Sequence, residues 1–203
     1  MIIVRYADDF VIGFQHESDA GRFLEELRER FCQFNLKLHA DKTRVIEFGR
    51  FASERREHRG QGKPPTFNFL GFTHVCGKTR KGKFVVLRQT IARRMHAKLA
   101  RLKTALRRCM HLPIPQVGRW LARVVSGHYR YYGVPRNYPA LDRFRDRVRW
   151  LWHRALNRRS QKGRINEAAM SRIPACWLPN PRICQPYPED RLAVIIQGKS
   201  PVR

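Results

Sequence analysis

Short apolar runs separated by polar turns make up the first third of the chain, a pattern typical of β-strands. Residues 2–6 and 10–14 are β-prone, and the turn-forming triplet Ala7-Asp8-Asp9 lies between them. This pattern predicts a β-hairpin with two carboxylates at its tip.

A helix is expected after this hairpin. Ser18 is a suitable N-cap, and apolar residues recur every three or four positions from there to about residue 34. The predicted apolar face consists of Phe23, Leu24, Leu27, Phe31 and Phe34.

Extended segments and a loop are expected over the next part of the chain. Residues 36–40 and 44–48 are short extended candidates, whereas the glycines and prolines within residues 49–66 predict a loop. Residues 67–76 and 83–87 predict a second β-hairpin, and the turn between them is basic.

The spacing of apolar residues changes near residue 90 to about 3.6 positions, which predicts three amphipathic helices. Pro113 and Pro115 separate the first two, and residues 133–139 form the loop before the third. The apolar faces consist of Ile91, Met95, Leu99, Leu102 and Leu106 in the first helix, Val117, Trp120, Leu121, Val124 and Val125 in the second, and Leu141, Phe144, Val148, Leu151 and Trp152 in the third.

Together these elements predict an α+β fold in three parts. Residues 1–89 form a part with β-hairpins and a helix, residues 90–165 form an all-α three-helix domain, and the proline-containing residues 166–203 form an extended C-terminal tail.

Charge is distributed unevenly along the chain. The 203 residues include 42 Lys and Arg but only 16 Asp and Glu, which gives a net charge of +26. Residues 1–50 hold 8 basic and 9 acidic side chains, whereas residues 51–203 hold 34 and 7. So large a positive excess on one part of a chain needs a polyanionic partner, and nucleic acid is the expected one.

Other features exclude several classes of protein. The five cysteines form no Cys-x-x-Cys motif, which argues against a zinc ribbon and against a disulfide-stapled secreted fold. No apolar run approaches the roughly 20 residues of a membrane helix, and no small-molecule cofactor is expected. A cytoplasmic, nucleoid-associated location is the expectation.

The adjacent carboxylates of Asp8 and Asp9 suggest a metal site. Two neighbouring negative charges are favoured when a cation neutralises them, and Mg²⁺, or Mn²⁺ in its place, takes oxygen ligands. The alternative is that the pair forms an ordinary solvated turn, since Asp is a common turn residue.

The surroundings of the pair resemble a known family. Tyr6-Ala7-Asp8-Asp9, framed by apolar strands, resembles the active-site box of group II intron-encoded reverse transcriptases/maturases. Further resemblances follow in the family's order at residues 36–38, 41–43, 69–72, 120–137 and 186–192. They imply that residues 1–89 are the C-terminal part of a polymerase palm and residues 90–165 the helical thumb, or maturase domain, of a mobile element's nucleotidyltransferase.

The resemblance also implies roles for individual residues. Asp8 and Asp9 would hold the catalytic metal ions, and Lys42 would protonate the leaving pyrophosphate; the alternative for Lys42 is an ordinary surface lysine. The primer and template would be supported by Tyr6 and by a primer grip made of Phe69, Leu70, Gly71 and Phe72.

The sequence also departs from the family. A complete reverse transcriptase supplies another metal-binding Asp and a fingers region upstream of the box, and Asp8 here is preceded by only seven residues. The expectation is therefore an N-terminally truncated fragment that is inactive alone, with a separately encoded N-terminal half as a partner. Clustered Cys and His pairs, as in an HNH-type endonuclease, are absent.

The basic part predicts binding of structured intron RNA and of an RNA/DNA primer-template, mainly through phosphate contacts. The alternative is a non-catalytic, RNA-binding, maturase-like module, and a third interpretation is a chain that does not fold alone. Trp150 is a further candidate for base stacking, whereas Trp120 and Trp152 are expected in the core. The predicted RNA-binding residues are Arg93, Arg94, Lys98, Arg101, Arg107, Arg108, Tyr129, Arg130, Tyr131, Arg145, Arg149, Arg158 and Arg159.

Overall fold

The protein is described by a computed structural model covering residues 1–159, 172–173 and 175–187. It contains two compact units, the N-terminal unit (Met1–Phe69 and Val75–Val86) and the helical unit (Leu70–His74 and Leu87–Arg203). Strands and two helices come first and three long helices follow, so the predicted α+β class is confirmed.

The N-terminal unit begins with the predicted hairpin. Strands β1 (Ile2–Tyr6) and β2 (Asp9–Gly13) pair antiparallel, with Ile2 opposite Gly13 and Tyr6 opposite Asp9. Two residues therefore connect the strands, a length typical of a tight hairpin.

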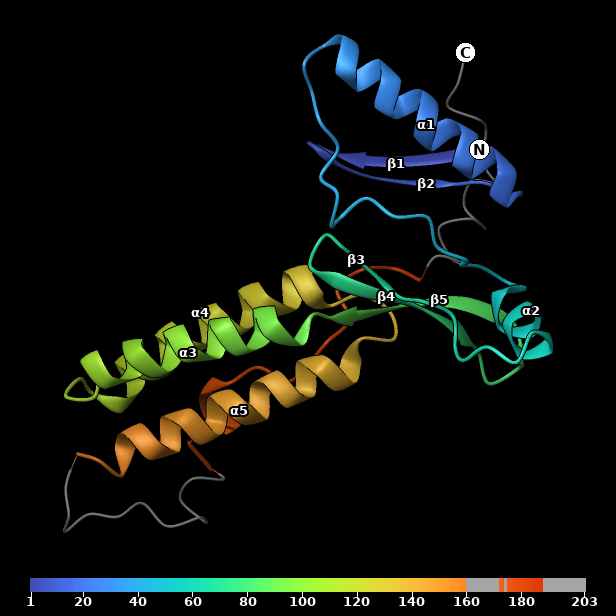
Figure 1. Ribbon diagram of the computed structural model, residues 1–203. Coiled ribbons are helices and arrows are strands. Elements are labelled where there is room, and N and C mark those ends of the chain that lie inside the picture. The colour runs from blue at the N-terminus through green and yellow to red at the C-terminus, as the bar shows by residue number, and fades with distance from the viewer. Residues whose placement is uncertain (160–171, 174, 188–203) are drawn as a thin grey trace, which may run out of the picture. The chain divides into compact units, whose positions relative to one another are not determined.

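Helix α1 (Glu17–Gln33) follows the hairpin and lies alongside it in Figure 1. The prediction that Ser18 is the N-cap is wrong, because the backbone becomes helical one residue after the extended His16 and Ser18 lies inside the first turn. Phe23 packs against Phe14, with ring centroids 5.4 Å apart. Phe34, assigned to the apolar face, is 60% exposed because the helix ends before it.

The predicted strands over 36–40 and 44–48 do not form; both segments are irregular. Phe48 instead packs edge-on against Phe67, with ring centroids 5.0 Å apart. A side-chain contact therefore positions residues 44–48, where backbone hydrogen bonds to a neighbouring strand were expected. Helix α2 (Ala52–His58) lies within the predicted loop and buries Ala52. Gly60, Gly62, Pro64 and Pro65, which suggested a loop, lie after this helix.

A three-stranded sheet with the order β3-β4-β5 replaces the predicted second hairpin. Its strands are β3 (Phe67–Phe69), β4 (Phe72–Lys78) and β5 (Phe84–Thr90). Leu70 and Gly71 split the first predicted arm, and both have positive φ, 47° and 82°. Positive φ at both central residues is typical of a type I′ turn, which joins antiparallel strands tightly.

The helical unit contains the three predicted helices, α3 (Ala92–Arg108), α4 (Ile114–Tyr132) and α5 (Tyr138–Leu156). Helix α5 packs against both α3 and α4 and lies below them in Figure 1. The periodic apolar residues of the three helices meet in one core. Trp152 lies in this core, as predicted, whereas Trp120 is half-buried and packs against the core. The fully buried core side chains are Leu121, Val125, Tyr129, Leu141, Phe144, Val148 and Trp152.

Buried Asn137 connects the start of α5 to the end of the sheet. Its Oδ1 accepts a hydrogen bond from Thr90 N (3.1 Å), and its Nδ2 donates to Thr90 Oγ1 and to Tyr132 O, both at 2.8 Å. A buried amide with all these partners stabilises one arrangement of the chain.

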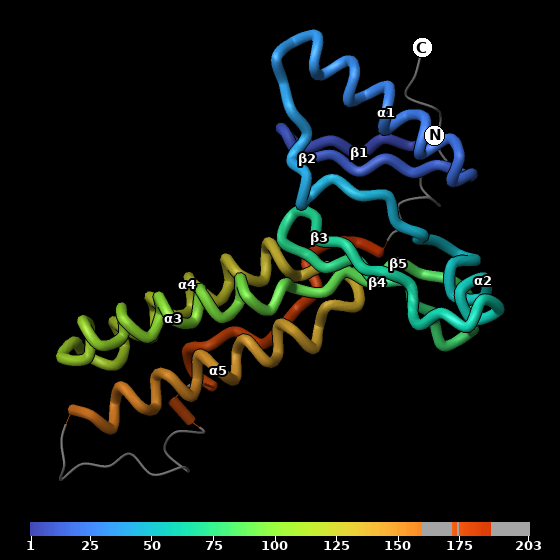
Figure 2. The backbone as a smooth tube through the Cα atoms, in the orientation of Figure 1, coloured from blue at the N-terminus to red at the C-terminus, as the bar shows by residue number. Residues whose placement is uncertain are grey.

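Residues 175–187 run back along the helices, as the red segment in Figure 2 shows. Trp177 covers Gly118 so closely that a Cβ at this glycine would lie 2.6 Å from the indole ring. Cys184 N donates to Gly133 O at 2.7 Å. The remaining predicted tail, including residues 188–192 of the last resembling segment, lies outside the described residues.

Candidate functional site

The carboxylate turn, residues 6–9, is formed by a strained backbone. Ala7 has a φ of 54°, in the left-handed region that non-glycine residues rarely occupy. Arg5 Nε donates a 2.9 Å hydrogen bond to Ala7 O and so holds the turn. Such local strain concentrates at functional sites.

The two carboxylates of this turn are open to solvent. Asp8 lies in the turn itself and Asp9 begins β2; both residues are exposed. The ion pairs found among the described residues include neither of them. Exposed, unpaired carboxylate oxygens suit a hard divalent cation. Over residues 1–159, 172–173 and 175–187, however, no three His, Cys, Asp or Glu side chains gather to hold a metal.

Lys42 lies in a separate turn of the same unit. The backbone N–H groups of Lys42 and Thr43 both donate to His39 O, at 3.2 and 2.9 Å, and Lys42 is exposed. No ion pair joins Lys42 to Asp8 or Asp9. Its role therefore stays a prediction.

Three residues of the predicted primer grip, Leu70, Gly71 and Phe72, belong to the helical unit. Tyr131 Oη donates to Leu70 O at 2.9 Å, and Ile91 N donates to Gly71 O at 3.2 Å. The buried Phe72 lies parallel to the Tyr131 ring, with centroids 6.0 Å apart. Tyr131 is thus a residue that supports this turn, a role that sequence reasoning missed because the two are 61 positions apart.

Most of the predicted RNA-binding side chains are exposed on the helical unit. The ion pairs of the described chain are Arg22–Asp19, Arg28–Glu25 and Arg59–Glu47, all in the N-terminal unit. None of these ion pairs involves an exposed predicted RNA-binding residue of the helical unit. The exposed predicted residues are Arg93, Arg94, Arg101, Arg107, Arg108, Arg130, Tyr131, Arg149, Arg158 and Arg159.

The prediction that Tyr129 contacts RNA is wrong. Tyr129 is 1% exposed and its Oη donates to Pro179 O at 3.3 Å, so the ring belongs to the core. Arg145 is half-buried and donates to Leu178 O at 3.5 Å. Lys98 is half-buried as well, with Nζ 5.5 Å from the centroid of the Phe144 ring. These side chains therefore make contacts within the helical unit.

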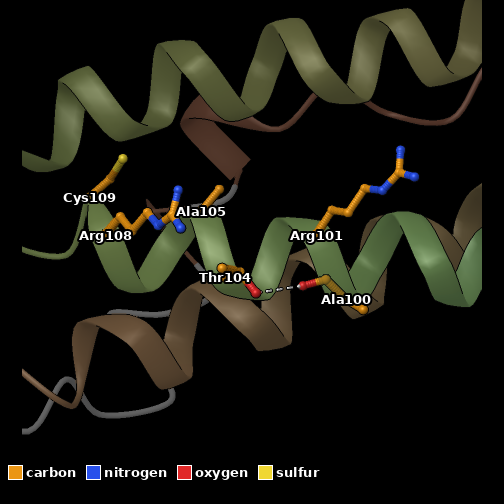
Figure 3. Close-up of a pocket in the computed structure, with 6 residues that line it drawn as sticks. All are labelled: Ala100, Arg101, Thr104, Ala105, Arg108 and Cys109. Atoms are coloured by element: carbon orange, nitrogen blue, oxygen red, sulfur yellow. Dashed lines mark hydrogen bonds between the residues drawn. The ribbon is translucent and has the colours of Figure 1, made fainter.

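A shallow hollow of about 480 Å³ lies on α3 (Figure 3). Thr104 Oγ1 donates to Ala100 O at 3.3 Å, so the hydroxyl is engaged within the helix. Arg101 and Arg108 line the hollow with these small residues. The surface therefore presents two guanidinium groups next to small side chains, an arrangement that suits the phosphates of a nucleic-acid backbone.

His128 is a buried titratable group at the centre of the helical unit. Its ring stacks on Phe144 with centroids 3.7 Å apart, and Lys98 Nζ lies 3.5 Å from His128 Nδ1. Burial, with the nearby Lys98 charge, lowers the pKa of His128 to about 3. Burial also lowers the pKa of Lys98. His128 is therefore neutral in the folded protein at neutral pH.

The helical unit is expected to lose stability in acid because of His128. Unfolded His128 binds a proton below about pH 6.5, whereas the folded residue does so only near pH 3. The contribution of neutral His128 to the free energy of unfolding is fully present above about pH 6.5. As the pH falls from 6.5 towards 3, the free energy of unfolding decreases by up to about 1.4 kcal/mol per pH unit. Urea unfolding at pH 7 to 4 measures this, and His128→Phe should flatten the slope while the exposed-site control His96→Gln does not. Equal slopes in all three proteins would contradict the assignment.

The comparisons with known proteins concern the N-terminal part. Residues 1–74 match the family model of reverse transcriptase (RNA-dependent DNA polymerase). The first 74 residues are reverse transcriptase-like. This match contains the carboxylate turn, Lys42 and the primer-grip residues, and it ends within β4, before the three helices. No curated protein and no solved structure gives a significant match.

Two further findings bear on the predicted chemistry. All five cysteines are free. Among the described helices, none is both long and apolar enough to cross a membrane.

Proposed function

We propose that this chain is the palm-and-thumb part of a group II intron-type reverse transcriptase/maturase. The observation that carries the proposal is the strained hairpin turn presenting Asp8 and Asp9 inside the reverse transcriptase-like segment. The reaction of the completed enzyme is template-directed addition of deoxynucleotides to a primer 3′-end. We place this activity in the cytoplasm, with the nucleoid.

Asp8 and Asp9 would contribute carboxylate oxygens to Mg²⁺ or Mn²⁺. When bound there, the ions would supply Lewis-acid stabilisation of negative charge on the primer hydroxyl and on the leaving pyrophosphate. No third acidic, His or Cys side chain joins them among the described residues. In this proposal a separately encoded N-terminal half would supply further ligands. Lys42 would donate a proton to the pyrophosphate, and Tyr6 and residues 69–72 would hold the primer end.

The helical unit would bind structured intron RNA and the primer-template duplex. Its exposed arginines lack acidic partners among the described residues, so their charge is available to phosphates. This same observation favours the second candidate, a non-catalytic RNA-binding module that assists splicing.

Replacing Asp8 by Asn separates the two candidates. We expect primer extension by this chain, mixed with a polypeptide that carries the upstream half of a related reverse transcriptase, to fall at least about 10²-fold in Asp8→Asn, because misplaced catalytic groups cost that much. Incorporation of labelled deoxynucleotides at 5 mM Mg²⁺ measures it. RNA affinity should stay unchanged.

Asp19→Asn is the matched control, since Asp19 is another acidic residue of the N-terminal unit and pairs with Arg22. It should leave synthesis intact. Equal synthesis by Asp8→Asn and Asp19→Asn would refute a catalytic role for the turn, and RNA binding without any complemented synthesis would favour the non-catalytic module.

A further inference from the structure

A groove of about 740 Å³ runs between α3 and α5 of the helical unit. Half-buried Met95 and Leu99 from α3 pack against the core and provide apolar surface in it. Charged and aromatic side chains of α5 provide the opposite wall. The groove is therefore apolar on one side and cationic on the other, unlike the shallow hollow on α3.

Trp150 supplies an aromatic surface in this groove. It is 46% exposed, whereas Trp152 is fully buried and Trp120 and Trp177 are half-buried against the core. The guanidinium carbon of Arg154 lies 4.6 Å from the centroid of the Trp150 ring, yet Arg154 does not line the groove. Arg154 therefore contacts the indole without lining the groove, and the exposed ring also lines the groove. An exposed indole is a platform on which a nucleobase stacks.

Three arginines of α5, Arg143, Arg147 and Arg149, line the groove beside this platform. All three are exposed, and no ion pair neutralises them in the described part of the chain. Arg143 uses its Nε to donate to Pro139 O at 3.2 Å, which orients the rest of its guanidinium. Neighbouring guanidinium groups along one groove can bind successive phosphates of a nucleic-acid strand.

Asp146 is the exception in this cationic wall. It lines the groove one helical turn from Trp150, and the described residues give it no ion-pair partner within 4.0 Å despite the arginines around it. A free carboxylate repels phosphate but accepts hydrogen bonds from base N–H groups. Guanine presents two adjacent N–H donors on its Watson–Crick edge, which match the two oxygens of one carboxylate.

We propose that the α3–α5 groove binds an unpaired nucleotide of single-stranded RNA, with guanine preferred. The base stacks on Trp150, Asp146 accepts the hydrogen bonds of the guanine edge, and Arg143, Arg147 and Arg149 hold the flanking phosphates. This inference rests on the proposed RNA-binding function, and it adds a site for a single base to contacts that otherwise read only the backbone.

Binding of labelled 12-mer RNAs to the full chain, followed by fluorescence anisotropy at 150 mM salt, tests the site. The probes are oligouridylate, oligouridylate with one central guanosine, a duplex RNA and a polyglutamate peptide. Trp150→Ala should weaken binding of the guanosine probe about 10-fold. Trp150→Phe should restore most of it, and Tyr138→Ala, at a residue of the same helix that is 47% exposed and outside the groove, should change nothing.

Asp146→Asn tests the choice of base. The wild-type chain should bind the guanosine probe about 5-fold or more tightly than oligouridylate. The variant should lose that difference while binding oligouridylate more tightly, because a repulsive charge is gone.

The outcomes separate this inference from the proposed function. Salt-sensitive RNA binding that Trp150→Ala leaves unchanged overturns the nucleotide site but keeps the RNA-binding function, whereas failure of the wild-type chain to bind any RNA overturns both. Polyglutamate binding as tight as RNA, or duplex binding equally sensitive to Trp150→Ala, also overturns the site. Unchanged guanosine preference in Asp146→Asn overturns the role of the carboxylate.

Discussion

Phe144→Ala is expected to destabilise the helical unit by about 3–5 kcal/mol. The Phe144 ring is fully buried, stacks on His128 and lies beneath the Lys98 ammonium. Truncation removes the ring's burial, leaves a cavity, and takes away the surface that both polar side chains contact. Urea unfolding followed by the helical circular dichroism signal gives the free energy of unfolding.

Two further variants make this result specific. Phe144→Leu fills most of the space and should cost less than about 1.5 kcal/mol. Tyr138→Ala, on the exposed surface of the same helix, should stay within about 0.5 kcal/mol of the parent. A Phe144→Ala protein as stable as the Tyr138→Ala protein would mean that the core is not built around this ring.

RNA affinity of the chain should fall about 10³-fold or more between 50 and 200 mM salt. That dependence is expected when six or more phosphates are contacted, because each contact releases a condensed counterion. The exposed arginines of α3, α4 and α5 are numerous enough to make these contacts. A plot of log affinity for a structured RNA against log salt concentration gives the slope.

Substitutions in the two units should affect this slope differently. The double variant Arg107→Ala/Arg108→Ala, at the end of α3, should reduce the slope by about 2. Arg22→Ala is the control, because Arg22 already pairs with Asp19 and lies in the N-terminal unit. A salt-independent affinity would refute phosphate contacts as the basis of binding.

The helices could be predicted from sequence because their signal is local and repeated. Leu99, Leu102 and Leu106 recur at helical spacing, and the same periodicity in α4 and α5 places the apolar residues in one core. Pro113 lies at the N-cap of α4, where a missing N–H costs nothing.

The irregular parts could not be predicted because distant contacts determine them. Residues 44–48 are apolar enough for a strand, but strands need neighbours, and Phe48 meets the Phe67 ring instead. Tyr129 and Tyr131 look alike in sequence, yet one is buried beside Pro179 and the other supports the Leu70 turn. Their positions on the helix could not show which tyrosine is buried, because Pro179 and Leu70, the residues they contact, are distant in the sequence.

The candidate site shows the same division. The carboxylate turn is local, since two β-prone runs around Ala7-Asp8-Asp9 suffice to place Asp8 and Asp9 on a tight hairpin. The roles of Lys42 and of a metal ion require groups that approach from other parts of a fold, and no local pattern supplies those. The α3–α5 groove requires two helices that are about 50 positions apart.

The contact between Gly118 and Trp177 links two positions that are 59 residues apart in the chain. The indole occupies the space that any side chain at 118 would need, so neither residue can change freely while the other stays. Among relatives of this protein, a larger residue at the position of Gly118 should accompany a smaller one at the position of Trp177. The two positions are therefore expected to evolve as a pair, and their covariation would mark the C-terminal segment as an inherited part of the helical fold.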